Sequence, residues 1–176
     1  MRVLLASASQ RRLDWLNGRY ESIELICKPL LSKEKNIENS ETVEKQSEDI
    51  CFSKAESAAL EWSLRESDTS NHPDMIIVSD TLVEAPEGIK IALGKPEDRM
   101  KAASMLLRLS GKRHRVWSST AILTRNNDQY QELYSEWRYK IWTDFAIVEF
   151  DDLSEEELIS LVESDSWVGK AGGYDF

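Results

Sequence analysis

The hydrophobic pattern of this 176-residue chain changes character once along its length. In the first half, short apolar runs of the buried-strand type alternate with helical patterns. From Val116 to Leu123 and from Tyr130 to Phe150, β-branched and aromatic residues instead predict a long antiparallel hairpin with its turn at residues 126–128. Strand–helix alternation followed by such a meander is typical of an α/β domain, so we expect a mixed sheet flanked by helices.

The expected elements follow from where each pattern begins and ends. Strands are predicted at residues 3–6, 22–27 and 75–78, the last ending at 79–81 and continued by 82–83 into a turn at 86–88. Helices are predicted at residues 13–18, 43–64, 96–111 and 154–162, with a polar loop at 31–40. A capping box at residues 154–157 opens the last of these helices. The helix after Pro96 is expected to present an apolar face of Met100, Ala103, Met105, Leu106 and Leu109.

Composition limits the class of protein. With 41% hydrophobic residues, the chain can bury an ordinary core, so residues 1–176 are expected to form a single domain. The net charge of -10 argues against a surface that grips a nucleic-acid backbone. Only Cys27 and Cys51 occur, without a CxxC or a Cys/His cluster, and no apolar run approaches a membrane span. We therefore expect a cytoplasmic protein with no nucleic-acid and no membrane partner.

The first candidate site follows the apolar run at residues 3–6. Ser7 and Ser9 supply two hydroxyls there, and Arg11 and Arg12 supply two guanidinium groups at a predicted helix start. Hydroxyls, guanidiniums and helix-start N–H groups are the donors that bind phosphate. The spacing fits equally well a second interpretation, in which Ser9 is an N-cap and the arginines lie on a solvated helix face.

Asp80 is the second candidate, because it follows the buried strand run at residues 75–78. Open α/β sheets often present ligand-binding side chains where strands end, so this carboxylate could hold a divalent cation or position a water molecule. For a lone aspartate at a strand end, a turn-capping role is the more common alternative.

Lys95 is the third candidate, since Gly94 lets the backbone approach a ligand closely and the lysine adds a charge before a helix. A loop that leads into a helix with Pro96 at its first position explains the same residues. Taken alone, Lys54 on the long helix and Glu34 in the polar loop would be ordinary solvated side chains.

Taken together and in order, these segments resemble the Maf family of nucleoside-triphosphate pyrophosphatases, and the resemblance runs from residue 3 to the chain end. The family's Ser-x-Ser-Pro-Arg-Arg and Lys-Ala are similar to residues 7–12 and 54–55. Its Ala-Asp-Thr-Val-Val and Gly-Lys-Pro are similar to residues 79–83 and 94–96. Its Leu-Ser-Gly-x-x-His-x-Val and Lys-Ala-Gly-x-Tyr are similar to residues 109–116 and 170–174.

Three features depart from the family pattern. Gln10 stands where the family has proline. The family continues after Lys-Ala-Gly-x-Tyr into Gly-Ile-Gln-Gly and a further segment, whereas this chain ends at Phe176, so a glutamine of the base pocket is absent. The acidic loop lacks the usual Asp-Glu pair, and counting between the phosphate loop and Lys54 points to Glu34, with Glu38 as the weaker alternative.

The resemblance implies an elongated α/β architecture like that of inosine triphosphate pyrophosphatase, with a nucleotide cleft between two lobes. It also implies cleavage between the α- and β-phosphates of a nucleoside triphosphate, with Mg²⁺ or Mn²⁺ as cofactor. Asp80 would be the general base or a metal ligand, and Glu34 would be a second metal ligand. The residues implied to bind the triphosphate are Ser7, Ser9, Arg12, Lys54 and Lys95.

Two positions bear on the choice of nucleotide. In the branch of the family that resembles dTTP and UTP hydrolases, an arginine follows Ser-Pro and a threonine follows the catalytic aspartate. Arg11 and Thr81 match that branch, so a pyrimidine nucleotide is expected. A nucleotide-binding regulator of septum formation with little catalysis, and an interaction protein built on the scaffold, are the alternatives. A homodimer through the predicted hairpin and the tryptophans is a further expectation.

Overall fold

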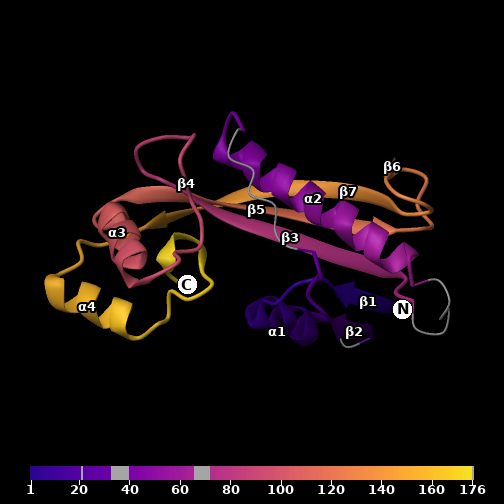
Figure 1. Cartoon of the computed structure of the whole chain (residues 1–176), viewed down its shortest axis with the longest axis horizontal. Helices are drawn as coiled ribbons and strands as arrows, with labels where there is room; N and C mark the ends of the chain where they lie inside the picture. The colour runs from indigo at the N-terminus through magenta and orange to yellow at the C-terminus, as the bar shows by residue number, and fades with distance from the viewer. Residues whose placement is uncertain (21, 33–39, 66–71, 176) are drawn as a thin grey trace. The chain divides into compact units, whose positions relative to one another are not determined.

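The computed structural model describes residues 1–20, 22–32, 40–65 and 72–175 and shows a mixed seven-stranded sheet with helices (Figure 1). The strand order is β2-β1-β3-β5-β7-β6, and β4 pairs with β3. The strands are β1 (Arg2–Leu5), β2 (Glu24–Cys27), β3 (Met75–Glu84), β4 (Ala92–Leu93), β5 (Arg113–Thr124), β6 (Gln131–Glu132) and β7 (Arg138–Glu149). The helices are α1 (Gln10–Arg19), α2 (Val43–Ser63), α3 (Arg99–Leu109), α4 (Glu155–Glu163) and the 3₁₀ helix η2 (Ala171–Gly173). The predicted α/β class and mixed sheet are confirmed.

The chain divides into two compact units. Unit 1 comprises Met1–Ile37, Glu48–Asp80 and Ser119–Trp142, and unit 2 comprises Glu38–Ser47, Thr81–Ser118 and Thr143–Phe176. The predicted cleft between two lobes and the elongated shape stay predictions. In the part of the chain that the structure describes, no helix combines the length and apolar character needed to cross a membrane.

Unit 1 is built around parallel strands. β1 pairs in parallel with β2 on one side and with β3 on the other, with Val3 opposite both Leu25 and Met75. On one face of this sheet, α2 contributes small side chains, among them Ala55 and Ala58, which are fully buried. Small residues let the helix backbone approach the strands closely, and Figure 1 shows α2 running along β3 and β5.

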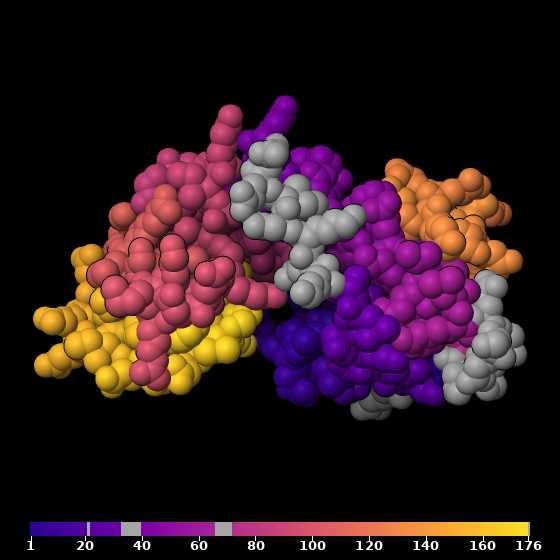
Figure 2. All heavy atoms as spheres, in the orientation of Figure 1, coloured from indigo at the N-terminus to yellow at the C-terminus, as the bar shows by residue number. Residues whose placement is uncertain are grey.

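Unit 2 has a second core. Leu106 and Leu109 of α3 pack against Val83 of β3 and Val116 of β5, and Tyr174 completes the cluster. The predicted capping box is confirmed: Ser154 caps α4 through the backbone N–H of Glu157, whose side chain bonds back to Ser154. Figure 2 shows α3 and α4 at the surface of this unit.

Two element boundaries differ from the sequence prediction. β3 does not end at residues 79–81 but continues to Glu84, because Leu82 and Val83 are themselves buried. α1 passes through Gly18 and ends at Arg19, because Gly18 does not adopt the positive φ with which a glycine commonly ends a helix.

The start and buried face of α3 also differ from the prediction. The helix begins after Asp98, whose side chain accepts a hydrogen bond from the N–H of Lys101 at 2.7 Å, so Pro96 precedes the helix. Its buried residues are Ala102, Leu106 and Leu109, whereas Met100 is 80% exposed. Ala103 and Met105 of the predicted face are partly buried, so the predicted apolar face fails mainly at Met100.

The predicted strand from Tyr130 to Phe150 is interrupted. Only residues 131–132 form β6, and β7 begins at Arg138. Ser135 in between adopts φ 57, and Trp137 turns into the core with 1% exposure. Burial of this large ring therefore takes precedence over a continuous strand.

Candidate active site

Asp80 and Lys54 form a buried ion pair in unit 1. Side chains alternate along β3, so Asp80 lies on the same face as Ile76 and Val78, the face that α2 covers. The Lys54 Nζ on α2 is 2.7 Å from Asp80 Oδ1, and only 19% and 8% of the two side chains are exposed. Asp80 thus projects from the interior of a strand, and the predicted turn-capping alternative is wrong.

The loop after β1 contributes the neighbouring cation. Ser9 is the N-cap of α1 and accepts a hydrogen bond from the Arg12 N–H at 3.4 Å, which confirms the capping interpretation. The arginine does not lie on a solvated face, however. Its Nη1 donates to Ser7 Oγ at 3.4 Å and to the Ser79 carbonyl at 3.3 Å. Arg11, one residue earlier, is exposed.

The Ser79 backbone carbonyl lies next to both the Arg12 and the Lys54 side chains. It accepts from Arg12 at 3.3 Å and lies 3.5 Å from Lys54 Nζ, so two cationic side chains converge beside Asp80. The Ser79 hydroxyl donates to the Ser119 carbonyl at 3.0 Å, which fixes β3 to β5 at this point. We call Arg12, Lys54, Ser79 and Asp80 the Asp80 cluster. Ser79 was not among the predicted site residues, although a serine within a buried apolar run is a signal for a specific role.

A cysteine thiol also lies beside this cluster. Cys51 is fully buried on α2, and its Sγ is 3.9 Å from the Val78 carbonyl. Burial, with a further contribution from the negative charge of Asp80, raises the pKa of the Cys51 thiol to about 12. The thiol is therefore protonated at neutral pH and is not a nucleophile there.

Thr81 and Lys95 belong to unit 2. Thr81 Oγ1 is 3.5 Å from Ser118 Oγ on β5. Lys95 is exposed and lies between Gly94 and the buried Pro96, in the connection from β4 to α3. The Gly94 carbonyl accepts a hydrogen bond from the Gly172 N–H at 2.9 Å, so the chain's last segment holds this loop.

The predicted metal ligands are only partly described. Glu34 lies outside the described residues, and Asp80 is the predicted ligand that the structure places. Within the described ranges, no group of three or more His, Cys, Asp or Glu side chains is arranged to hold a metal ion. Mg²⁺ commonly binds one or two carboxylates and completes its shell with substrate phosphate oxygens and water. The Asp80 carboxylate fits that mode of binding, but no closed all-protein metal cage is present among the described residues.

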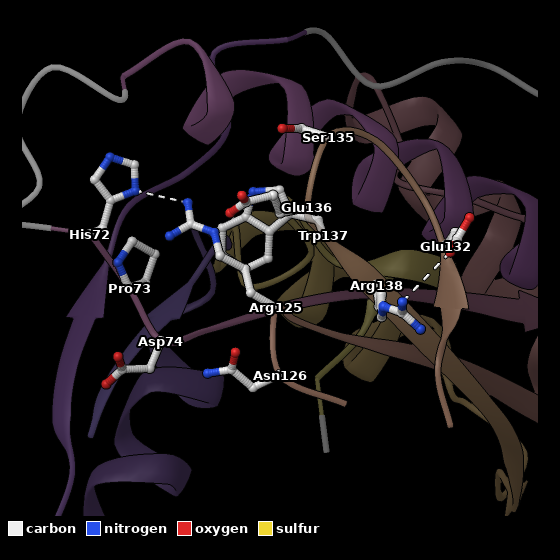
Figure 3. Close-up of a pocket in the computed structure, with 10 residues that line it drawn as sticks. All are labelled: His72, Pro73, Asp74, Arg125, Asn126, Glu132, Ser135, Glu136, Trp137 and Arg138. Atoms are coloured by element: carbon white, nitrogen blue, oxygen red, sulfur yellow. Dashed lines mark hydrogen bonds and ion pairs between the residues drawn. The ribbon is translucent and has the colours of Figure 1, made fainter. Parts of the chain in front are cut away.

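Unit 1 contains a second polar site near the start of β3. A pocket of about 660 Å³ is lined by residues 72–74, 125–126, 132 and 135–138, and we call it the His72 pocket. Figure 3 shows the Arg125 guanidinium beside Trp137 and directed at His72; it stacks 4.4 Å from the ring centroid and bonds His72 Nδ1 at 3.1 Å. Sequence reasoning did not anticipate this pocket, because its residues come from segments that are far apart in the chain.

The chain is similar to proteins of known family. A family model described as Maf-like protein matches residues 2–176. A dTTP/UTP pyrophosphatase of Ruegeria sp. (strain TM1040) is 31% identical over 174 residues, which are 99% of this chain and 77% of that protein. Another, from Ruminiclostridium cellulolyticum, is 32% identical over 98% of this chain and 77% of its own length. A human protein named probable bifunctional dTTP/UTP pyrophosphatase/methyltransferase is 32% identical over 98% of this chain and 26% of its own length.

Two solved structures share the fold. The Staphylococcus aureus Ham1 protein matches with a TM-score of 0.53 at 13% identity, over 85% of this chain and 71% of that one. A HAM1 protein from Coxiella burnetii matches with a TM-score of 0.50 at 15% identity, over 85% of this chain and 72% of that one. At these identities the likeness concerns the fold alone.

Proposed function

Because this chain belongs to the Maf family, we propose that it is a nucleoside-triphosphate pyrophosphatase, which hydrolyses the bond between the α- and β-phosphates and releases a nucleoside monophosphate and pyrophosphate. The observation that carries the proposal is the Asp80 cluster, in which a buried carboxylate lies 2.7 Å from a lysine and next to a carbonyl bonded by Arg12. A carboxylate flanked by two cations suits a reaction in which an anionic substrate is attacked by water.

Each group of the cluster has a role in this reaction. Arg12, with the hydroxyls of Ser7 and Ser9, binds phosphate oxygens at the start of α1, where helix N–H groups add to the positive potential. Lys54 approaches the same region from α2 and offsets charge on the triphosphate and on the departing pyrophosphate. Asp80 orients the attacking water and accepts its proton, or holds the cation. Lys95 is the remaining residue that we propose to bind phosphate.

A divalent cation, Mg²⁺ or Mn²⁺, is part of the proposal. It would supply charge neutralisation on the phosphate oxygens, and Asp80 is the described residue that would hold it, with Glu34 as the second ligand.

The proposed substrate is a pyrimidine nucleotide of the dTTP/UTP type. Relatives at about 30% identity over nearly the whole chain are named dTTP/UTP pyrophosphatases, which supports this choice. Arg11 on α1 and Thr81 on β3 are the two residues that match the corresponding branch of the family. We also propose a cytoplasmic location, which the two free cysteines support, and a homodimer.

The deciding experiment measures pyrophosphate release from a panel of common and modified nucleoside triphosphates, with Mg²⁺, with Mn²⁺ and with chelator. Asp80→Asn is the test variant, and Asp74→Asn is the matched control, because Asp74 is exposed and its Oδ2 accepts a hydrogen bond from the backbone N–H of Arg2 at 2.7 Å. Release that needs both the cation and Asp80, with dTTP or UTP as best substrate, is the expected result. Release that is indifferent to Asp80 would overturn the proposed roles.

The alternative function is a nucleotide-binding regulator with little catalysis. It predicts metal-dependent nucleotide binding without pyrophosphate release by the wild-type chain. The buried Lys54–Asp80 pair favours the enzyme, because nucleotide binding alone does not require a buried carboxylate beside the phosphate-binding groups.

A further inference from the structure

The Lys-Ala-Gly-x-Tyr motif at residues 170–174 has no part in the chemistry described so far, yet it makes specific contacts within unit 2. Its Gly172 N–H donates to the Gly94 carbonyl at 2.9 Å, next to Lys95. This contact joins two segments that are far apart in the chain. The motif therefore bears directly on the loop that carries the lysine.

Both glycines of the motif are favoured by backbone conformation, and Gly172 is also required by space. Gly172 has φ 72, and a Cβ there would lie 2.8 Å from Val83 Cγ2, closer than side chains tolerate. Gly173 has φ 79, and a Cβ there would lie 3.8 Å from Pro96 Cγ and 3.6 Å from the Ala102 carbonyl oxygen. The segment thus lies against both sides of the Lys95 loop, namely the Gly94 backbone and the Pro96 ring.

Tyr174 holds this segment in place. Its hydroxyl is 2.6 Å from His114 Nε2, and the two residues are 7% and 4% exposed. Phe150 packs edge-on against both rings, with centroids 4.7 Å from Tyr174 and 5.5 Å from His114. Burial lowers the pKa of His114, so its neutral ring can accept the hydroxyl proton at Nε2. A buried tyrosine hydroxyl held by a hydrogen bond of 2.6 Å restrains the ring, and with it the two glycines.

We propose that Tyr174 and His114 are positioning residues that act on the reaction through Lys95: their hydrogen bond fixes the Gly172–Gly173 segment, which fixes the Gly94–Pro96 loop. The inference rests on the proposed function for the role of Lys95. It explains why an exposed lysine is placed between two anchored residues, since a flexible lysine on a flexible loop would lose more conformational entropy when it binds phosphate.

The first test is amide hydrogen exchange of the full chain. Tyr174→Phe removes one hydroxyl and keeps the ring, so the amides of residues 93–95, 97–98 and 171–173 should exchange faster while those of α2 and β3 keep their protection. Tyr139→Phe is the matched control, because Tyr139 also donates its hydroxyl to one side chain, Gln131 Oε1 at 2.8 Å, in the other unit. Unchanged exchange at residues 93–95 and 97–98 in Tyr174→Phe would overturn the inference.

The second test is a double-mutant cycle on kcat/KM for the best nucleotide. Tyr174→Phe should lower kcat/KM about fivefold in the wild-type background, as expected for loss of one buried hydrogen bond, and by less than about twofold in the Lys95→Ala background. A tyrosine that merely stabilises the fold would have the same effect in both backgrounds. Additive effects would therefore contradict the inference. Gly172→Ala gives a second route to the same loop and should reproduce the non-additivity with Lys95→Ala.

The two proposals fail separately. Absence of pyrophosphate release by the wild-type chain, with loop exchange that depends on Tyr174, removes the proposed function and leaves the structural coupling of Tyr174 to the Lys95 loop. Normal release combined with exchange or kinetics that are indifferent to Tyr174 removes the inference and leaves the proposed function intact.

Discussion

Unit 1 contains two polar clusters, the Asp80 cluster and the His72 pocket, and they differ in how their charges are treated. In the Asp80 cluster, the ion pair spans 2.7 Å and both side chains are largely buried. In the His72 pocket, Arg138 pairs at 3.5 Å with Asp128 and Glu132, whose side chains are 98% and 84% exposed. The Asp80 cluster buries both charges of its ion pair, whereas the carboxylate partners of Arg138 stay exposed to solvent.

This difference indicates which cluster carries chemistry. Burying a charged pair costs desolvation energy that the attraction between the charges does not reliably offset, so such pairs often mark functional sites. Exposed pairs contribute little to stability and are common on any surface. In the pocket, the half-buried Arg125 bonds a histidine nitrogen and stacks on Trp137, which is an arrangement that holds structure together. Charge burial therefore favours the Asp80 cluster as the site of chemistry.

The largest expected effect comes from Asp80→Asn. The change removes the proposed base or cation ligand while keeping the side-chain shape, so turnover should fall by roughly 10² or more while the chain still folds. Asp74→Asn, near the other end of the strand, should keep turnover within about twofold. Steady-state pyrophosphate release by the two variants checks the comparison directly. Equal losses in both variants would mean that the buried carboxylate has no special role.

Lys54→Met tests the cost of burying the pair. Without the ammonium, Asp80 remains 6% exposed beside an apolar side chain, so the free energy of unfolding should fall by about 2 kcal/mol. The double variant Lys54→Met/Asp80→Asn should recover much of this loss, because no uncompensated charge is then buried. Urea unfolding measures both, and Lys140→Met, which removes an exposed lysine, is the control. A double variant less stable than Lys54→Met would contradict the account.

Part of this site was predictable from the sequence. Ser7, Ser9, Arg12 and Asp80 were candidates because their side chains carry phosphate-binding or acid–base chemistry, whereas Lys54 was identified only through the resemblance to the Maf family. Their spatial relation was not predictable from spacing, since it depends on α2 packing over β3 through its small residues and on the continuation of β3 past Asp80. The link through a backbone carbonyl, that of Ser79, leaves no mark on side-chain patterns.

The fold likewise contains features that local sequence signals predict and features that they do not. Hydrophobic period and caps predicted α2, α4 and the core of β3, because these signals are local. The interruption before β7 coincides with the burial of Trp137 in the core, which local propensity does not report. The start of α3 is set by the Asp98 cap, a local signal that the sequence prediction passed over in favour of Pro96.

Arg12→Ala should weaken nucleotide binding about tenfold or somewhat more, since a charge-assisted phosphate contact contributes about 1.5 to 3 kcal/mol. Arg19→Ala is the matched control on the same helix, because that guanidinium stacks on Trp15 and is exposed. Calorimetric titration with a non-hydrolysable nucleotide measures both affinities. An Arg12→Ala variant that binds as tightly as the wild type would place the bound phosphates away from the Asp80 cluster.

The hydrogen-bonded pair of His114 and Tyr174 in unit 2 is buried like the Lys54–Asp80 pair but does not consist of opposite charges. The pKa of His114 is lowered from 6.5 by burial, so the unfolded chain takes up a proton first as the pH falls. Stability should therefore decline below pH 6.5, by about 1.4 kcal/mol for each unit of pKa difference, and no such decline should come from this group above that pH. His114→Gln should reduce this pH dependence in thermal unfolding scans. An unchanged profile would assign the acid sensitivity to other groups.

Arg138→Ala should have the smallest effect. Its side chain is 27% exposed and its two carboxylate partners are almost fully solvated, so the free energy of unfolding should change by no more than about 1 kcal/mol. Pyrophosphate release should stay within about twofold of the wild type, because the arginine lies in the His72 pocket and its ion-pair partners, Asp128 and Glu132, are not members of the Asp80 cluster. Raising the salt concentration should reduce any difference in stability between the variant and the wild type, since salt screens exposed ion pairs. A tenfold loss of turnover in Arg138→Ala would show that the pocket is coupled to the reaction, and charge burial would then be a poor guide to function in this unit.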